Sequence, residues 1–220
     1  FNIGRKLYNE RFGIWWVIVY AGSILPHFYF RSGIIDPWFN LLIFIAIWFF
    51  VQLNTNSESI KPSKRFLYAA LWGSFTGLAI LTKGPTALLI VGLVVAIAYI
   101  PSLLQLVNLK SRFLKSPPLF NLRLTDILVF FLFTILIGGS WFLAQLMNGH
   151  ADMVWKFILY QVRLFTIPDA GHGGHWSYHF IVLLVGVFPA SLFALMRFRI
   201  PGSQSADQRR FHSIMLILFW

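Results

Sequence analysis

The side chains best suited to bind or transfer a polar group lie in a few short stretches of this sequence. They are Arg31 and Asp36, Lys83, Arg163, and three histidines at His172, His175 and His179. Arginine and lysine can hold an anionic oxygen group, and a carboxylate can take a proton from a reacting hydroxyl. Together they have the chemistry to bind a phosphate group and to activate an acceptor.

The pair Asp36-Pro37 has two interpretations. Asp36 is a favourable helix N-cap, and Pro37 is a favourable first helical residue. Alternatively, Asp36 orients or deprotonates an acceptor while Arg31 holds an anion through two hydrogen bonds. Both roles can coexist, so Asp36 is the candidate catalytic residue.

Lys83 stands in the short turn T-K-G-P at residues 82–85. A lysine at the end of a helix can compensate the helix dipole, and Gly-Pro breaks the helix. The same lysine at the depth of lipid headgroups could grip a phosphate. The residues alone do not separate these two roles.

The histidine loop also leaves alternatives open. His175 and His179 are four residues apart and would share the face of a helix that begins here. With His172 they could bind a divalent metal ion, although interfacial histidines more often bond to lipid phosphate or to the backbone. Trp176 and Tyr178 are typical of an aromatic belt at a membrane surface, or they could stack against a sugar.

These residues are set among long apolar runs. Of the 220 residues, 58% are hydrophobic and only 11% are charged, whereas soluble domains carry about a quarter charged residues. The runs cover residues 12–30, 37–53, 66–82, 85–106, 126–147 and 178–196, and a seventh begins at Phe211. Since about 20 apolar residues cross a bilayer as a helix, we expect an all-α transmembrane bundle with six complete spans in a single domain.

Most of the 18 lysines and arginines lie in alternate loops between these runs. The positive-inside rule assigns those loops to the cytoplasm, so the net charge of +11 indicates topology and not nucleic-acid binding. The exceptions are Arg31, Lys83, Lys156 and Arg163, which are expected on the outer side. Ionisable residues retained at that face are functional candidates.

The one long segment expected on the outer side covers residues 148–177. We expect it to contain a helix over residues 152–165 that lies in the membrane interface. Because there is no cysteine, thiolate metal sites and cysteine nucleophiles are excluded. Phosphate-binding glycine loops and the G-x-S-x-G motif are also missing. The binding of a nucleotide-linked donor within these residues is therefore not expected.

The order of these features resembles the bacterial branch of the GT-C membrane glycosyltransferases, which includes protein O-mannosyltransferases and the lipid A aminoarabinose transferase. The string G-L-A-I-L-T-K-G-P at residues 77–85 is the most specific part of the likeness, with H-W-S-Y at 175–178 and G-V-F-P at 186–189. The resemblance implies a transferase that takes a sugar from a polyprenyl-phosphate carrier at the periplasmic face of the bacterial inner membrane. The acceptor would be a lipid, glycan or protein.

The family places its catalytic carboxylate on an earlier outer loop. The chain starts without Met and stops inside an apolar run, so we expect a fragment whose principal base lies upstream of Phe1. The resemblance carries over Asp36 as a catalytic residue, with carrier phosphate and sugar bound by Arg31, Lys83, Arg163, His172, His175 and Tyr178. The sequence does not decide whether a divalent metal ion serves as a cofactor. The alternative functions are a lipid-sugar flippase or secondary transporter, and a polymerase or ligase that uses a polyprenyl-linked donor.

Overall fold

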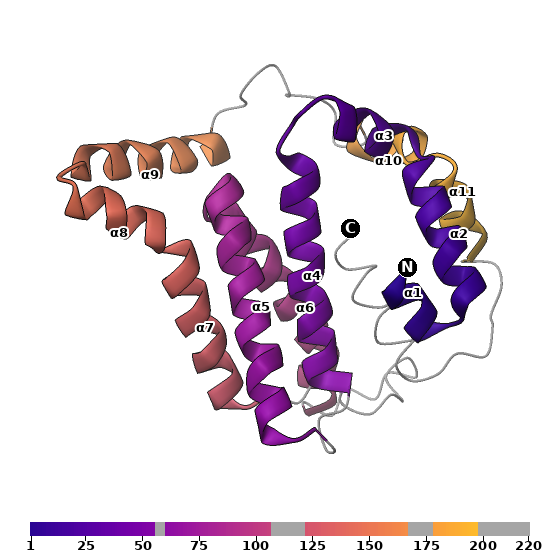
Figure 1. Cartoon of the computed structure of the whole chain (residues 1–220), viewed down its shortest axis with the longest axis horizontal. Helices are drawn as coiled ribbons and strands as arrows, with labels where there is room; N and C mark the ends of the chain where they lie inside the picture. The colour runs from indigo at the N-terminus through magenta and orange to yellow at the C-terminus, as the bar shows by residue number, and fades with distance from the viewer. Residues whose placement is uncertain (56–59, 107–121, 167–177, 198–220) are drawn as a thin grey trace. The chain divides into compact units, whose positions relative to one another are not determined.

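Every regular element in the described part of the chain is an α-helix. The computed structural model describes residues 1–55, 60–106, 122–166 and 178–197 (Figure 1). The helices are α1 (Asn2–Leu7), α2 (Glu10–Ala21), α3 (Ile24–Arg31), α4 (Asp36–Thr55), α5 (Pro62–Lys83), α6 (Thr86–Leu106), α7 (Leu124–Gly138), α8 (Ser140–Met147), α9 (Ala151–Thr166), α10 (Tyr178–Gly186) and α11 (Ala190–Arg197). The predicted all-α class is confirmed for these residues.

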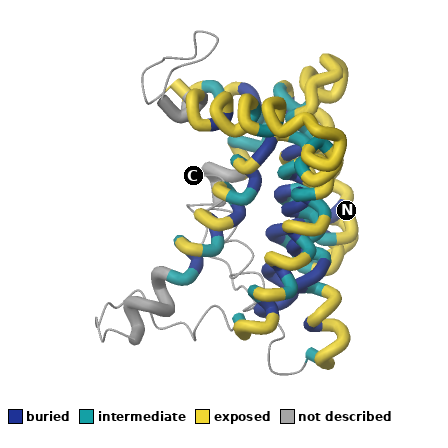
Figure 2. The backbone as a smooth tube through the Cα atoms, turned by 90° about the vertical axis from the view of Figure 1, so that its left-hand side faces the viewer, coloured by how far each residue is buried: buried dark blue, intermediate teal, exposed yellow. Residues whose placement is uncertain are grey.

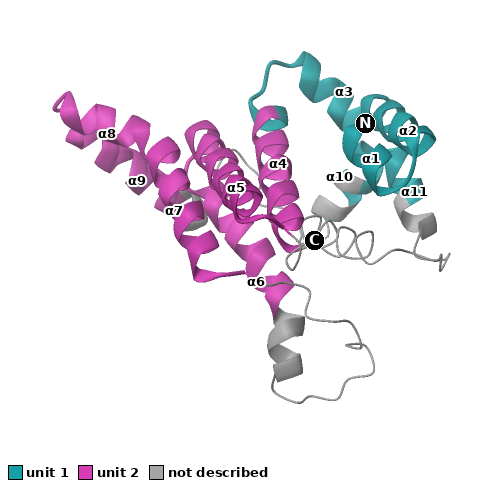
Figure 3. Cartoon of the chain, turned by 60° about the horizontal axis from the view of Figure 1, so that its bottom comes forward, with its two compact units in different colours: residues 1–37, 166–208 teal, residues 38–165, 209–220 magenta. Residues whose placement is uncertain are grey.

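The chain divides into two compact units (Figure 3). Unit 1 comprises Phe1–Pro37 and Thr166–Gln208, and unit 2 comprises Trp38–Phe165 and Arg209–Trp220. Each unit is described separately below.

Unit 1 contains a bend of 64° between α2 and α3. The buried hydroxyl of Ser23 at this bend donates to the carbonyl of Val19 at 2.7 Å and lies 3.3 Å from the carbonyl of Val187. The N–H of Ile24 donates to the carbonyl of Phe188 at 3.2 Å. Val187 and Phe188 lie between α10 and α11, so the breaks in two predicted spans bind each other.

Unit 2 is built on an apolar core shared by α4, α5, α6 and α7 (Figure 2). The ring of Trp72 on α5 stacks on Phe130 of α7, with centroids 3.9 Å apart, and lies 5.1 Å from the ring of Phe50 on α4. Helix α6 contributes Ala87 and Val91, which are fully buried. Aromatic pairs of this kind add about 0.5–1.5 kcal/mol beyond the area that they bury.

Helices α5 and α7 approach closely because small residues line their contact. A Cβ on Gly73 would lie 2.3 Å from the carbonyl oxygen of Phe130, and one on Gly77 would lie 2.9 Å from the backbone nitrogen of Gly138. The hydroxyl of Thr134 donates to the carbonyl of Gly73 at 3.2 Å. Small residues spaced by four are typical of helix pairs within membranes.

The number of candidate spans is smaller than expected. Two helices, Asp36–Asn54 and Pro62–Lys83, are long and apolar enough to cross a membrane, by length and composition. Counting α2 with α3, and α7 with α8, as one bent span each raises the number to four. The prediction of six complete spans is therefore wrong for the described residues; the seventh run, from Phe211, lies outside them.

The breaks explain this difference, because they fall inside apolar sequence. Run 12–30 bends between α2 and α3, run 126–147 bends by 46° between α7 and α8, and run 178–196 divides into α10 and α11. Within run 85–106 the apolar helix that can be assessed is Thr86–Tyr99, which is short for a span. Average hydropathy does not register bends of this kind, which occur at glycine, serine and proline.

Candidate functional site

The candidate site lies at the end of unit 2 where α5 turns into α6. Lys83 is the last residue of α5 and is exposed, and its ammonium lies 5.6 Å from the ring centroid of Phe39 on α4. An ammonium over an aromatic face is attracted by the ring quadrupole. The ring thus holds a positive charge at the end of a long apolar helix, where an anion in solvent or headgroups can reach it.

The backbone of the turn accounts for the residues that follow Lys83. Gly84 has φ 79° and ψ −162°, a conformation essentially restricted to glycine, and its N–H donates to the carbonyl of Ile80 at 2.7 Å. The hydroxyl of Thr82 donates to the carbonyl of Ala79 at 2.7 Å. The turn is therefore shaped by its own hydrogen bonds, and Lys83 is its charged member.

Helix α9 packs on this turn. A Cβ on Gly84 would lie 3.0 Å from the ring of Phe157 and 3.2 Å from the side-chain amide of Gln161, which is only 8% exposed. The ring of Phe157 also lies 5.7 Å from the rings of both Trp141 and Phe142 on α8. In Figure 1, α9 accordingly runs crosswise to α5, from beside the end of that helix outward over α8.

The two cations of α9, Arg163 and Lys156, lie on another face of that helix. Arg163 is exposed and is two residues from Gln161, which places it about 200° around the helix from the face that packs on Gly84. Lys156 lies 3.3 Å from Asp152 in an exposed ion pair, and the hydrogen bond from Lys156 lowers the pKa of Asp152. Neither Arg163 nor Lys156 is therefore brought to the Lys83 turn by the packing of α9.

The remaining predicted site residues belong to unit 1 or to parts that the structure does not describe. Arg31 is the exposed last residue of α3, Asp36 is the half-buried first residue of α4, and Tyr178 is the exposed first residue of α10. The start of α4 at Asp36 agrees with the sequence pattern. His172 and His175 lie outside the described residues. His179 is on α10, but its side chain is also outside them, so the proposed metal set is not tested.

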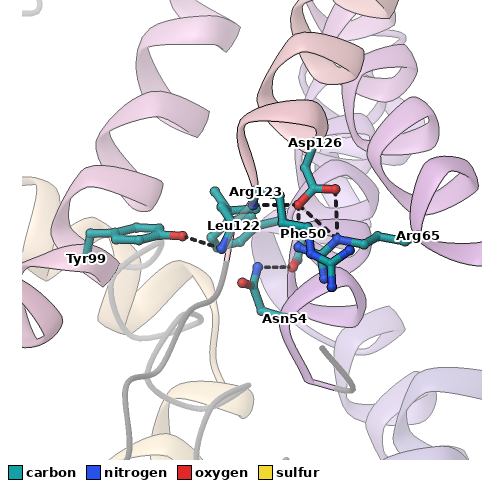
Figure 4. Close-up of polar contacts among 7 residues, drawn as sticks. All are labelled: Phe50, Asn54, Arg65, Tyr99, Leu122, Arg123 and Asp126. Atoms are coloured by element: carbon teal, nitrogen blue, oxygen red, sulfur yellow. Dashed lines mark hydrogen bonds and ion pairs between the residues drawn. The ribbon is translucent and has the colours of Figure 1, made fainter. Parts of the chain in front are cut away.

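Sequence reasoning missed a buried ion pair at the other end of unit 2 (Figure 4). The guanidinium of Arg65 on α5 donates to both carboxylate oxygens of Asp126 on α7, with Nε at 2.9 and 3.1 Å. The two residues are 4% and 3% exposed. Asp126 also accepts the backbone N–H of Arg123 at 2.8 Å, and so caps the start of α7.

Two further hydrogen bonds lie close to this pair. The hydroxyl of Tyr99 accepts the N–H of Leu122 at 3.2 Å, and the amide of Asn54 donates to the carbonyl of Phe50 at 2.8 Å (Figure 4). The sequence offered one usable signal for the ion pair, namely an aspartate at the start of the apolar run predicted over residues 126–147, which the structure places in the first turn of α7. Its arginine partner is 61 positions away in the chain and could not be chosen from spacing.

Comparison of the chain with models of protein families, with curated proteins and with solved structures gave no significant match.

Proposed function

We propose that this chain is part of an integral-membrane glycosyltransferase that moves a sugar from a polyprenyl-phosphate carrier to an acceptor at the outer membrane face. The observation that carries the proposal is the position of Lys83, an exposed ammonium held over an aromatic ring at the end of an apolar helix bundle. An amphipathic lipid phosphate would place its anion at this depth.

The distribution of side chains in unit 2 supports membrane insertion. Large apolar side chains are exposed along α7, where Leu128, Leu132, Ile135 and Leu136 are at least half exposed. Polar side chains such as Thr76 and Thr134 are buried between helices. A water-soluble bundle would not present a contiguous apolar surface of this kind, whereas lipid provides a matching solvent.

The resemblance noted in the sequence supports the sugar-transfer part of the proposal, and the structure sharpens which residues of the G-L-A-I-L-T-K-G-P string matter chemically. Gly77 packs against α7, Ala79 is fully buried, Thr82 bonds to its own helix, and Gly84 forms the turn. Lys83 is the charged member of the string, and it is exposed. We therefore assign carrier-phosphate binding first to Lys83.

Transfer needs a base for the acceptor and cations for the departing lipid phosphate. Lys83 supplies a cation, and Asp36 is the carboxylate candidate on this chain. Arg31, Arg163, Tyr178, His172 and His175 remain candidates for binding the sugar or the phosphate, and a divalent metal held by the histidines remains part of the proposal.

The test is sugar transfer by the protein reconstituted in liposomes with a polyprenyl-phosphate-linked sugar and a membrane acceptor fraction. Lys83→Ala is expected to lower the rate by about a hundredfold or more, because one electrostatic contact to a leaving group is lost. Arg163→Ala is expected to retain much more of the rate, because Arg163 lies on another face of α9 than the one that packs on the Gly84 turn. Movement of the lipid-linked sugar across the bilayer without transfer would contradict the proposal and favour a flippase.

A further inference from the structure

Helix α9 packs on its neighbours through one face and exposes side chains on the others, among them Met153 and Tyr160 beside the packed face. Phe157 and Gln161 pack on the Gly84 turn and on α8. Trp155, Ile158, Leu159 and Val162 are 61%, 42%, 49% and 57% exposed. Their spacing of three, four and seven residues places them on one side of the helix, which we call the apolar stripe of α9.

Another face is charged. Asp152, Lys156 and Arg163 are four and seven residues apart, so they form a ridge beside the apolar stripe and away from the packed face. The Lys156–Asp152 pair is exposed, with side chains 77% and 70% accessible. The ridge carries two cations and one carboxylate, so its formal net charge is positive.

This order of faces matches a helix at the boundary between headgroups and acyl chains. Such a helix directs an apolar side toward the acyl chains and a basic side toward water and anionic headgroups. Helix α9 also runs crosswise to α5 and not alongside it (Figure 1). A helix in that direction lies in the membrane plane when α5 crosses the bilayer.

The neighbouring helix α8 also exposes large apolar side chains. Leu143, Leu146 and Met147 on the neighbouring α8 are 60%, 51% and 78% exposed. An isolated protein-docking patch would be bordered by polar residues on all sides. The stripe instead has a charged border along the ridge, and α8 adds further exposed apolar side chains nearby in the chain.

We propose that the apolar stripe of α9 binds the headgroup–acyl boundary of a phospholipid bilayer, with Lys156 and Arg163 directed toward anionic headgroups. The inference rests on the membrane part of the proposed function and is independent of sugar transfer. It assigns Arg163 to lipid contact, because the packing of α9 turns this residue away from the Lys83 turn.

The absence of cysteine allows a direct test with single nitroxide labels. Val162→Cys and Ile158→Cys report on the stripe, Lys156→Cys reports on the ridge as the matched control, and Ile135→Cys on α7 reports on the bundle. The labelled protein is reconstituted in vesicles of phosphatidylethanolamine and phosphatidylglycerol. Collision rates with oxygen, which partitions into lipid, are compared with those of a water-soluble nickel complex.

We expect oxygen to dominate at positions 158, 162 and 135, and the nickel complex to dominate at position 156. Nickel access at 158 and 162 with oxygen access at 135 would overturn the inference and leave the membrane proposal intact. Nickel access at 135 would overturn both. Spin–spin broadening at 162 that disappears on dilution with unlabelled protein would show that a second copy covers the stripe, which also overturns the inference.

Discussion

At the scale of single residues, the Arg65–Asp126 pair is the most strongly constrained polar contact in the described chain. Both side chains are almost fully buried, and Asp126 also caps α7 through the N–H of Arg123. Burying two charges carries a large desolvation cost that only good geometry and additional hydrogen bonds offset. The pair therefore fixes how α5 and α7 align more than it adds to net stability.

Removing one partner should accordingly be far more damaging than removing both. Asp126→Asn is expected to destabilise the protein by about 3–5 kcal/mol, because it leaves a buried guanidinium without its countercharge. The double change Arg65→Leu with Asp126→Leu should recover much of that loss. Thermal unfolding in detergent measures both variants.

The exposed Lys156–Asp152 pair provides the matched control, since Asp152→Asn removes a paired carboxylate whose side chain is 70% accessible to solvent. The melting temperature of the Asp152→Asn variant should stay close to that of the parent protein. Equal losses for Asp126→Asn and Asp152→Asn would contradict the structural role assigned to the buried pair.

At the scale of helices, glycine has opposite roles at positions that the sequence does not distinguish. Gly73 and Gly77 allow α5 to touch α7, whereas Gly92 on α6 faces open space with no atom within 4 Å of an added Cβ. A glycine in an apolar helix can therefore either allow a close helix contact or have no packing role.

Gly73→Ala should separate α5 from α7, because the new Cβ would lie 2.3 Å from the carbonyl oxygen of Phe130. Gly92→Ala should be neutral or stabilise by up to about 1 kcal/mol through helix propensity. Melting temperatures of the two variants in the same detergent make the comparison. Equal tolerance of both would be inconsistent with the α5–α7 contact.

A second pair of glycines tests whether α9 packs on the turn between α5 and α6. Gly84 and Gly149 have positive φ values of 79° and 78°, so alanine introduces backbone strain at both positions. At Gly84 the Cβ would also meet Phe157 and Gln161, whereas nothing lies within 4 Å at Gly149. Gly84→Ala should therefore expose α9 to limited proteolysis much more than Gly149→Ala does. Identical digestion patterns would show that α9 is not held by this turn.

These helices also show what the sequence could and could not predict. The Gly84-Pro85 break and Asp36 set helix bounds near the predicted ones, because proline and a capping carboxylate act locally. Helix α5 begins at Pro62, before the predicted start of its run at residue 66. The bend at Ser23 was missed because it depends on the carbonyl of Val187 in a distant segment. Long-range contacts of this kind have no local signature.

The candidate site, too, was predicted only in part. Lys83 stood out because a cation beside Gly-Pro between two apolar runs is unusual. Its partner Phe39 and the covering Gln161 were not predicted, since neither carries a charge or a motif. Arg163 was grouped with Lys83 by sequence position alone, and the face of α9 that packs on Gly84 places it on the other side.

At the scale of the whole molecule, the two ends of α5 carry different chemistry. One end holds Arg65 in a buried ion pair, and the other presents Lys83 over Phe39. The helix between them has 22 residues, or roughly 33 Å at 1.5 Å per residue, which is close to the thickness of a hydrocarbon core. The account therefore predicts that lipid phosphate is recognised at the Lys83 end alone.

The most direct measurement of this claim is the affinity of the purified protein for a polyprenyl phosphate, determined by native mass spectrometry in detergent. Lys83→Ala should weaken binding by roughly 10- to 100-fold, because one charge-assisted contact is worth about 1.5–3 kcal/mol. Lys64→Ala, which removes the same side chain near the opposite end of α5, should bind like the parent protein. Equal affinities for the parent and Lys83→Ala, or a loss confined to Lys64→Ala, would contradict the account.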